Sequence, residues 1–224
     1  MDQPLVSCVC PTANRHKYIP QLLDSFLSQT WQNKELIILD DGKKPCTNEL
    51  IQVHRQIQYF KLPEKLNIPK KRNLLAKLAN GKYIIHFDDD DWSAPGRIAA
   101  QMKHHQQFSV GIVGFHSILF WSEITQEVWR YSGTKGYACG TSFCYLKSFW
   151  KRHPFPENQD LGSDNSVIYP ARANNQSATF DGGQLIVARI HQGQSNFKDL
   201  RGRNYAKVQL SSLPPAFPTF CQQT

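Results

Sequence analysis

Residues 81–95 read GKYIIHFDDDDWSAP. The part KYIIHF is short and mostly apolar, which is typical of a buried β-strand. Four adjacent aspartates, residues 88–91, follow it directly, and Trp92 comes next. Because this acidic run lies between apolar residues, part of it must be removed from water, where uncompensated carboxylates are costly. The stretch therefore predicts that a cation binds at the end of a buried strand.

The residue types in this run favour a particular kind of cation. Oxygen ligands suit Mg²⁺ or Mn²⁺ better than zinc. In an extended segment, Asp88 and Asp90 would project to the same side of the chain. A hard cation held by few protein groups takes its remaining ligands from substrate phosphates, so the run indicates a nucleotide site. The alternative is an acidic turn exposed to solvent.

Strands and helices alternate in the first half of the chain. Residues 19–31 keep their apolar side chains on one helical face, and residues 69–81 open with Pro69 in the first turn and close on Gly81 as a C-cap. The expected strands are residues 5–11, 34–41, 57–62 and 82–88. This order predicts an α/β fold with a parallel sheet that is covered on both faces.

Polar clusters follow three of these strands directly. They are residues 11–15 (PTANR), 40–42 (DDG) and the aspartates 88–91. In open parallel sheets, ligands bind beyond the carboxyl ends of the strands. We therefore expect these three clusters to meet at one edge of the sheet.

The second half of the chain has a less regular pattern. We expect two strands in residues 110–131, a strand running into a short helix in residues 142–150, a helix in 163–175 and a strand in 185–191. No repeat or linker marks a boundary, so residues 1–210 are expected to form a single domain. Residues 211–224, with three prolines, are expected to be an irregular tail.

Composition limits the class of protein. The chain has 224 residues, 40% of them hydrophobic, enough for one domain with a full core. No segment approaches the roughly 20 apolar residues that span a bilayer, and the start lacks a basic region followed by a long apolar one. The six cysteines form no CxxC pair, so reduced thiols are expected. The expected location is the cytoplasm, with peripheral attachment to the inner face of a membrane as the alternative.

Several motifs occur in an order that resembles a known family. VSCVCPTANR (6–15), LIILDDGK (36–43) and NIPKKRNLLAKLANGKYIIHFDDDDW (67–92) are similar to the P-T-x-N-R turn, the D-D-G-S segment, and the G-x-x-x-A-R-N helix with the D-x-D metal motif of the family-2 glycosyltransferases. The resemblance is strong over about the first 105 residues. It implies the GT-A fold, a Rossmann-like, mostly parallel central sheet flanked by helices, with a nucleotide-sugar-binding half (1–105) and a smaller, mixed acceptor-side half (106–210).

The resemblance also implies a metal-dependent, inverting transfer of a sugar from a nucleotide sugar, with a UDP-sugar favoured, to a hydroxyl group. The acceptor would be a glycan, a lipid-linked glycan or a protein. Asp88 and Asp90 would be the D-x-D pair that holds Mn²⁺ or Mg²⁺, with Asp90 the direct ligand. His191, in VARIHQGQS, would join the metal, and the alternative is a structural histidine. Asp91 would shape the turn or contact the sugar.

Donor-binding roles follow from the same motifs. Either Asp40 or Asp41 would accept a hydrogen bond from the base, which is typically uracil in this family. Arg72, at the start of a helix, would meet phosphate or base, and the adjacent lysines 70 and 71 belong either to the same site or to a solvated basic turn. The implied donor-binding residues are Pro11, Thr12, Arg15, Asp40, Asp41, Arg72, Asp88 and Asp89.

Inverting transfer also needs a base for the proton of the acceptor hydroxyl. The segment GSDNSVIYPAR resembles the family's E-D pair and identifies Asp164 as this base, although Ser163 replaces the glutamate. The alternatives are that Ser163 or Asp164 only caps a helix, and that Asp160 is the base. Tryptophans 92, 121, 129 and 150 would provide a sugar-stacking platform or belong to the core.

Two other classes of function remain as alternatives. A nucleotidyltransferase acting on sugar phosphates would share the α/β fold and the carboxylate-bound metal, but PTANRHK lacks the expected glycine-rich loop. A nucleic-acid-binding protein would suit the net charge of +8. Its lysines and arginines are nevertheless dispersed, without a long basic run, which disfavours nucleic acid as a partner.

Overall fold

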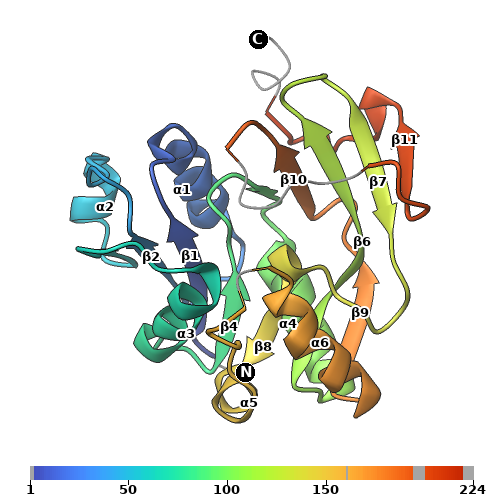
Figure 1. The fold of residues 1–224 in the computed structure, drawn as a ribbon, viewed down its shortest axis with the longest axis horizontal. Coiled ribbons are helices and arrows are strands. Elements are labelled where there is room, and N and C mark those ends of the chain that lie inside the picture. The colour runs from blue at the N-terminus through green and yellow to red at the C-terminus, as the bar shows by residue number, and fades with distance from the viewer. Residues whose placement is uncertain (1–2, 160, 194–199, 219–224) are drawn as a thin grey trace.

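A mixed β-sheet runs through the computed structural model, which describes residues 3–159, 161–193 and 200–218 (Figure 1). Its strands are β1 (Val6–Thr12), β2 (Lys34–Asp40), β3 (Ile57–Lys61), β4 (Tyr83–His86), β5 (Trp92–Ser93), β6 (Ile112–Ser122), β7 (Val128–Ser132), β8 (Cys144–Leu146), β9 (Ser177–Asp181), β10 (Ile186–Ile190) and β11 (Tyr205–Val208). The helices are α1 (Ile19–Leu27), α2 (Glu49–Val53), α3 (Ile68–Leu78), α4 (Arg97–Phe108), α5 (Lys147–Arg152) and α6 (Ser163–Ala173). Short 3₁₀ turns cover His16–Tyr18, Gly140–Ser142 and Leu210–Ser212.

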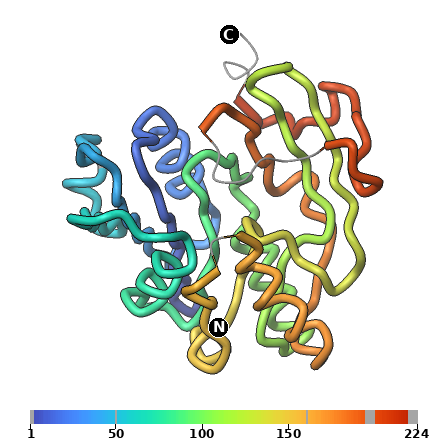
Figure 2. Tube along the Cα trace, viewed as in Figure 1, coloured from blue at the N-terminus to red at the C-terminus, as the bar shows by residue number. Residues whose placement is uncertain are grey.

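The strand order places the two halves of the chain side by side. Hydrogen bonds join the strands in the order β11-β7-β6-β8-β4-β1-β2-β3, with β9 and β10 beside β6, and β5 beside β10. The path of the chain shows β1–β3 with α1–α3 on one side and β6, β7 and β9–β11 on the other (Figure 2). Strands β4 and β8 lie between them, so the end of β4 faces both halves.

Strands β1–β4 form the parallel half of the sheet, with β4 and β2 on either side of β1 and β3 beside β2. Their bounds fall within two residues of the expected strands. Because side chains alternate along a strand, β1 packs on both faces. Cys8 and Cys10 lie in the core under α1, and Val9 lies in the core under α3. The prediction of an α/β fold with a parallel sheet covered on both faces is confirmed.

Helix α3 begins where the sequence indicated but ends earlier. The Asn67 side chain caps it by accepting a hydrogen bond from the Lys70 amide at 3.0 Å. Ala79 is the C-cap, so the prediction that Gly81 closes this helix is wrong. Gly81 is needed for another reason, because a Cβ at this position would lie 2.6 Å from the Ser7 hydroxyl oxygen on β1.

Strand β6 is the central strand of the second half. It pairs antiparallel with β7 and β8 and parallel with β9 and β10. The two strands expected in residues 110–131, the strand-to-helix segment in 142–150, the helix in 163–175 and the strand in 185–191 are all present. Helices α2 and α4 and strands β5, β9 and β11 were not predicted. Strand β11 pairs antiparallel with β7 at the edge of the sheet.

The start of the C-terminal tail packs on the sheet. Leu213 and Phe217 are buried, and the Phe217 ring lies 5.7 Å from both Trp92 and Trp121 between ring centroids. These two indoles are therefore core residues beneath the tail. Residues 219–224 lie outside the described part of the chain.

The described cysteines carry free thiols, and the described helices can be checked for membrane-spanning length. Five cysteines are free thiols, and Cys221 lies outside the described residues; the five are Cys8, Cys10, Cys46, Cys139 and Cys144. Among the helices of residues 3–159, 161–193 and 200–218, none is long and apolar enough to cross a membrane.

Candidate active site

A cleft of about 360 Å³ opens at the carboxyl ends of β1 and β4, where the two halves of the sheet meet. Its charged lining comprises Arg15, Arg72, Asp88, Asp89, Asp90, Asp91, Asp164 and Arg189. Its apolar and aromatic lining comprises Pro11, Ile68, Ile118, Phe120, Tyr131, Tyr137, Cys139, Ala188 and Tyr205. The structure thus brings together in one cavity the aspartate run, the first turn after β1, the start of α3 and the start of α6.

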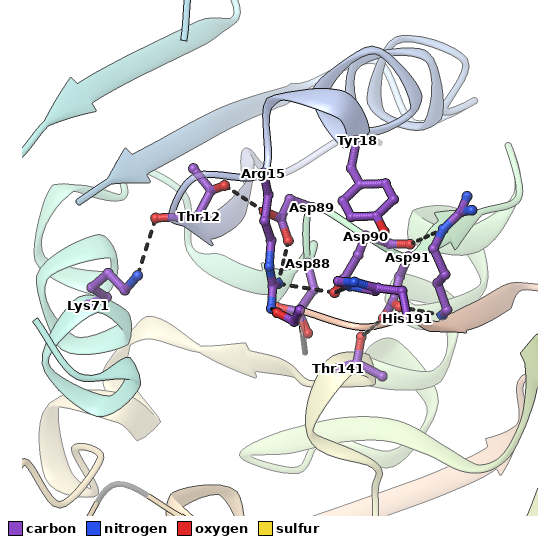
Figure 3. A network of polar contacts seen from close by, with 12 residues as sticks. Thr12, Arg15, Tyr18, Lys71, Asp88, Asp89, Asp90, Asp91, Thr141 and His191 are labelled. Carbon is purple, nitrogen blue, oxygen red and sulfur yellow. Dashed lines mark hydrogen bonds and ion pairs between the residues drawn. The ribbon is translucent and has the colours of Figure 1, made fainter. Parts of the chain in front are cut away.

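The aspartate run forms a turn. Strand β4 ends at His86, and the Asp91 amide donates a hydrogen bond to the Asp88 carbonyl oxygen at 3.4 Å. The expectation that this segment is extended is therefore wrong. In this turn the carboxylates point to different partners, except that Asp89 and Asp90 share Arg15 (Figure 3).

Asp89 and Asp91 hold the turn in place. Asp89 is fully buried, and it accepts hydrogen bonds from the Thr12 hydroxyl at 2.5 Å and from Arg15 Nη1 at 3.0 Å. Asp91 accepts hydrogen bonds from the Thr141 hydroxyl and from the Arg189 amide, the latter at 3.0 Å. Burial raises the pKa of Asp89 to about 6 and raises that of Asp91 well above its usual range, with repulsion from neighbouring aspartates adding to both. The hydrogen bonds to Asp89 and Asp91 therefore offset only part of the cost of burying these two carboxylates.

Asp88 and Asp90 lie on the open side of the turn. Asp90 Oδ2 lies 3.0 Å from Arg15 Nη1 and 2.9 Å from His191 Nε2. Asp88 has the more exposed side chain, at 22%, and its nearest cation is Arg72 Nη2 at 3.9 Å. Burial raises the pKa of Asp88, against the lowering effect of Arg72. Of the three residues expected at a metal, Asp88 and Asp90 line the cleft, and His191 contacts Asp90.

The chemistry of these side chains fits a hard cation. Within the described ranges, no group of three or more His, Cys, Asp or Glu side chains is placed so that it could hold a metal ion, so Asp88, Asp90 and His191 do not converge on one point. Two carboxylates and one imidazole beside a cleft nonetheless match a cation that completes its coordination with ligand oxygens. Burial and the neighbouring carboxylates raise the pKa of Asp88 despite Arg72, and a bound cation would offset part of that cost.

Arg15 lies directly over the aspartate turn. Its Nη1 bridges Asp89 and Asp90, both at 3.0 Å (Figure 3). Its Nη2 donates to the Gly193 carbonyl oxygen at 2.7 Å. The nearby carboxylates raise the pKa of this guanidinium, which burial alone would lower. Arg15 was expected to bind the donor, and the structure places it at the aspartates.

The two aspartates at the end of β2 have separate partners. Asp40 is fully buried, and it accepts hydrogen bonds from the Gly42 amide at 2.7 Å and the Tyr59 hydroxyl at 2.6 Å. Asp41 accepts hydrogen bonds from Lys71 Nζ and from the Leu66 amide, both at 2.8 Å. A second recess is lined by Asn14, Asp41, Gly42, Lys43, Lys61, Leu62, Pro63 and Lys65. Of the two candidates for base contact, Asp41 lines this recess.

The two lysines at the start of α3 differ in burial. Lys71 is buried against Asp41 and also donates to the Thr12 carbonyl oxygen at 3.2 Å (Figure 3). The alternative of a solvated basic turn is therefore wrong for Lys71, because the side chain is buried. Lys70 is exposed. Lys71 therefore holds β1, β2 and α3 together beneath the recess.

Arg72 connects the aspartate turn to the candidate base. Its Nη1 forms an ion pair with Asp164 Oδ1, while its Nη2 lies 3.9 Å from Asp88 Oδ1. Asp164 lies in the first turn of α6, whose N-cap is Gly162 without any side-chain capping bond. The alternative that Ser163 or Asp164 only caps this helix is therefore wrong. Asp160, the other candidate base, lies outside the described residues.

Gly140 forms the floor beneath Asp164. A Cβ on Gly140 would lie 1.9 Å from Asp164 Oδ2 and 2.5 Å from its Cγ, so only glycine leaves room for the carboxylate in this position. Sequence reasoning missed Gly140, Thr141 and Arg189 as parts of the site. The small residues of ACGTSF and the arginine of VARIH were visible, but nothing local indicates that they meet the aspartate turn.

Comparison with known proteins identifies the family to which the chain is similar. The family model described as glycosyl transferase family 2 matches residues 7–171. An uncharacterized glycosyltransferase of Rickettsia conorii is 28% identical over 229 residues, which cover 95% of this chain and 37% of the relative. The putative colanic acid biosynthesis glycosyl transferase WcaA of Escherichia coli is 32% identical over 114 residues, which cover 47% of this chain and 39% of the relative. The chain thus spans less than half the length of these curated relatives.

Solved structures share the fold at low sequence identity. TarS residues 1–349 of Staphylococcus aureus, in complex with UDP, superpose with a TM-score of 0.66 at 18% identity, covering 84% of this chain and 61% of that one. The mannosyltransferase PcManGT of Pyrobaculum calidifontis, in complex with GDP-Man and Mn²⁺, gives a TM-score of 0.65 at 16% identity, covering 85% of this chain and 57% of that one. At these identities the likeness establishes the fold.

Proposed function

Because the chain belongs to glycosyl transferase family 2 and has the GT-A fold of its structural neighbours, we propose that it transfers a sugar from a nucleotide-sugar donor to an acceptor hydroxyl. The observation that carries this proposal is the meeting of the aspartate turn, Arg72 and Asp164 in one cleft. Such a cleft offers positive charge for a departing diphosphate and a carboxylate for the incoming hydroxyl. Residues 1–210 would act as one domain, with 1–105 binding the donor and 106–210 the acceptor.

The nucleoside would occupy the recess beside Asp41. Asn14 lines this recess, and its neighbour Arg15 lines the cleft, so a nucleoside diphosphate can cross the turn after β1 from one to the other. The Asp41 side chain is fully buried against Lys71 and the Leu66 amide, so accepting a bond from the imino group of uracil would require this carboxylate to become exposed to the recess. The structural likeness to TarS bound to UDP supports a UDP-sugar, and guanine from a GDP-sugar is the competing base.

The donor diphosphate would lie over the aspartate turn. Asp88 and Asp90, with His191 beside them, would hold Mn²⁺ or Mg²⁺, which when bound neutralises the charge of the leaving diphosphate. Arg15 would exchange its carboxylate partners for phosphate oxygens, which its fork of donors matches well. Asp89 and Asp91 would keep the turn folded through Thr12 and Thr141.

Asp164 would act as the base of a single inverting displacement. The acceptor hydroxyl attacks the anomeric carbon on the face opposite the leaving group, the bond electrons pass to the diphosphate, and the hydroxyl proton passes to Asp164. Arg72 orients the carboxylate by its ion pair, and Gly140 leaves the space that the carboxylate occupies. The acceptor would be a glycan, a lipid-linked glycan or a protein hydroxyl.

Thermal stability in the presence of ligands tests the proposal. The melting temperature is measured with UDP, GDP, CDP and double-stranded DNA, each with and without Mn²⁺. We expect one nucleoside diphosphate to raise the melting temperature in a Mn²⁺-dependent way, because a ligand that binds only the folded state stabilises it. A response to DNA alone would contradict the proposal and favour a nucleic-acid-binding protein.

A further inference from the structure

We propose that Tyr131, Tyr137 and Tyr205 form an acceptor subsite that binds a hexopyranose ring, so that the acceptor is a carbohydrate. This subsite rests on the proposed function, because a site for the acceptor is meaningful only if the same cleft also binds the sugar donor. The three tyrosines come from β7, from the loop before the Gly140–Ser142 turn, and from β11, and all three line the cleft with Asp88 and Asp164.

The tyrosine wall is built by pairing at the edge of the sheet. Tyr131 on β7 and Tyr205 on β11 are directly opposite each other in the antiparallel register, with ring centroids 5.1 Å apart. Phe120 on β6 packs edge-on to Tyr205 at 5.7 Å. The tyrosine side chains are only partly buried, so ring surface stays accessible in the cleft.

The polar ends of these tyrosines are available to a ligand. Among the described residues, the hydroxyls of Tyr131 and Tyr205 have no hydrogen-bond partner. Burial raises the pKa of Tyr131 to about 12, so the phenol keeps its proton and can donate. The Tyr137 hydroxyl donates to Asn165 Oδ1 at 2.8 Å, which joins the wall to the residue that follows Asp164.

The indoles are not part of this wall. Trp121 and Trp92 are 1% and 6% exposed, and none of the five tryptophans lines the cleft. The sugar-stacking platform considered for the tryptophans therefore belongs, in this fold, to tyrosines. No single tyrosine of the wall stood out in the sequence, because Tyr131 and Tyr205 are separated by more than 70 residues.

A pyranose ring matches this surface better than a lipid or a peptide does. One face of the ring carries weakly positive C–H groups that pack on the negative face of an aromatic ring, and its rim carries hydroxyls for the phenol groups. A prenyl chain in the same place would leave the phenol groups without hydrogen-bond partners, which is unfavourable once they are removed from water. The cleft volume of about 360 Å³ is near the lower end for ligand pockets, so it suits one acceptor ring beside the donor sugar.

Saturation-transfer NMR on the full chain tests the subsite without requiring turnover. The probes are the methyl α- and β-glycosides of glucose, galactose, mannose and N-acetylglucosamine, with and without UDP and Mn²⁺. We expect at least one glycoside to receive saturation, and Tyr131→Ala or Tyr205→Ala to weaken its binding by about tenfold, the effect of losing one stacked aromatic contact. Tyr131→Phe keeps the ring and should retain most of the binding.

A matched control separates loss of the subsite from loss of the fold. Phe108→Ala removes a 48% exposed aromatic ring on α4, outside the cleft, and should leave glycoside binding unchanged. UDP and GDP affinity, measured by calorimetry on the same variants, should match that of the wild type. If neither nucleotide binds the wild type, the proposed function fails while the glycoside result stands by itself. Three results would overturn the subsite. The wild type could bind none of the glycosides, both alanine variants could bind a glycoside as tightly as the wild type does, or the wild type could bind farnesyl phosphate in place of the glycosides.

Discussion

Substituting Gly140 by alanine would displace the carboxylate of Asp164 with little other change. The φ angle of Gly140 is negative, so alanine fits its backbone. The added Cβ would meet Asp164 Oδ2 at 1.9 Å, whereas real Cβ contacts do not fall below 3.0 Å, so the carboxylate must move by at least about 1.1 Å. Asp164 is a flexible side chain near the cleft surface, and it can move without unfolding the protein.

The size of the kinetic effect follows from this displacement. A misplacement of about 1 Å in a reacting group can lower a rate by about 10²-fold. Transfer from the nucleotide sugar to a methyl glycoside should therefore fall by about that factor in Gly140→Ala. The affinity for the nucleoside diphosphate, measured by calorimetry, should stay the same, because Asp41 and Arg15 are not disturbed.

The control for this variant is Gly96→Ala. A Cβ on Gly96 would meet nothing within 4 Å, so this substitution adds the same methyl group in open space. Gly96 is the N-cap of α4, and its replacement should change the melting temperature slightly and transfer hardly at all. Wild-type transfer rates in Gly140→Ala would refute the placement of Asp164, and a parallel loss of nucleotide affinity would show that the effect is not confined to the base.

Three further perturbations test other parts of the structure. Lys71→Met leaves the buried Asp41 carboxylate without its cation and should lower the free energy of unfolding, measured with denaturant, by about 3–5 kcal/mol; equal stability of Lys71→Met and of the exposed control Lys70→Met would contradict this. Burial lowers the pKa of His105, so the unfolded chain takes up a proton near pH 6.5 that the folded chain does not; stability should therefore fall as the pH drops below about 6.5. His105→Gln should reduce that slope, and an unchanged slope would exclude His105 as its source. Asp90→Ala and EDTA treatment should each abolish turnover, with Mn²⁺ binding followed by electron paramagnetic resonance; turnover in EDTA would exclude the metal role.

The parallel half of the fold could be predicted because its signals are local. Each of β1 to β4 is a continuous apolar run, and α1 and α3 bury apolar stripes against them. Helix α4 lacks this signal. Its buried face carries Arg97, Gln101 and His105, which bond to backbone carbonyl oxygens of the β4 end, the Gly140–Ser142 turn and β8 at 2.7–2.9 Å. A polar stripe that satisfies tertiary partners cannot be distinguished from an exposed one in a single sequence.

The site was predictable in its acidic and basic residues but not in its geometry. The aspartate run indicated buried negative charge, and the structure bears this out, because Asp89, Asp90 and Asp91 are buried. The turn could not be predicted, because it depends on Thr141 and on the Arg189 amide, which are about 50 and 98 residues away from Asp91 along the chain. The tyrosine wall depends in the same way on the pairing of β7 with β11.

Asp164→Asn tests the central claim most directly. The amide keeps the shape of the side chain and removes the base, so kcat for transfer should fall by about 10² to 10⁴. Titration of the nucleoside diphosphate with Mn²⁺ into the wild type and the variant should give equal affinities, because Asp164 contacts Arg72 and not the nucleoside recess. Equal binding with transfer only in the wild type is the result that the structure predicts. Full transfer by the Asn variant, or no nucleotide binding by either protein, would contradict it.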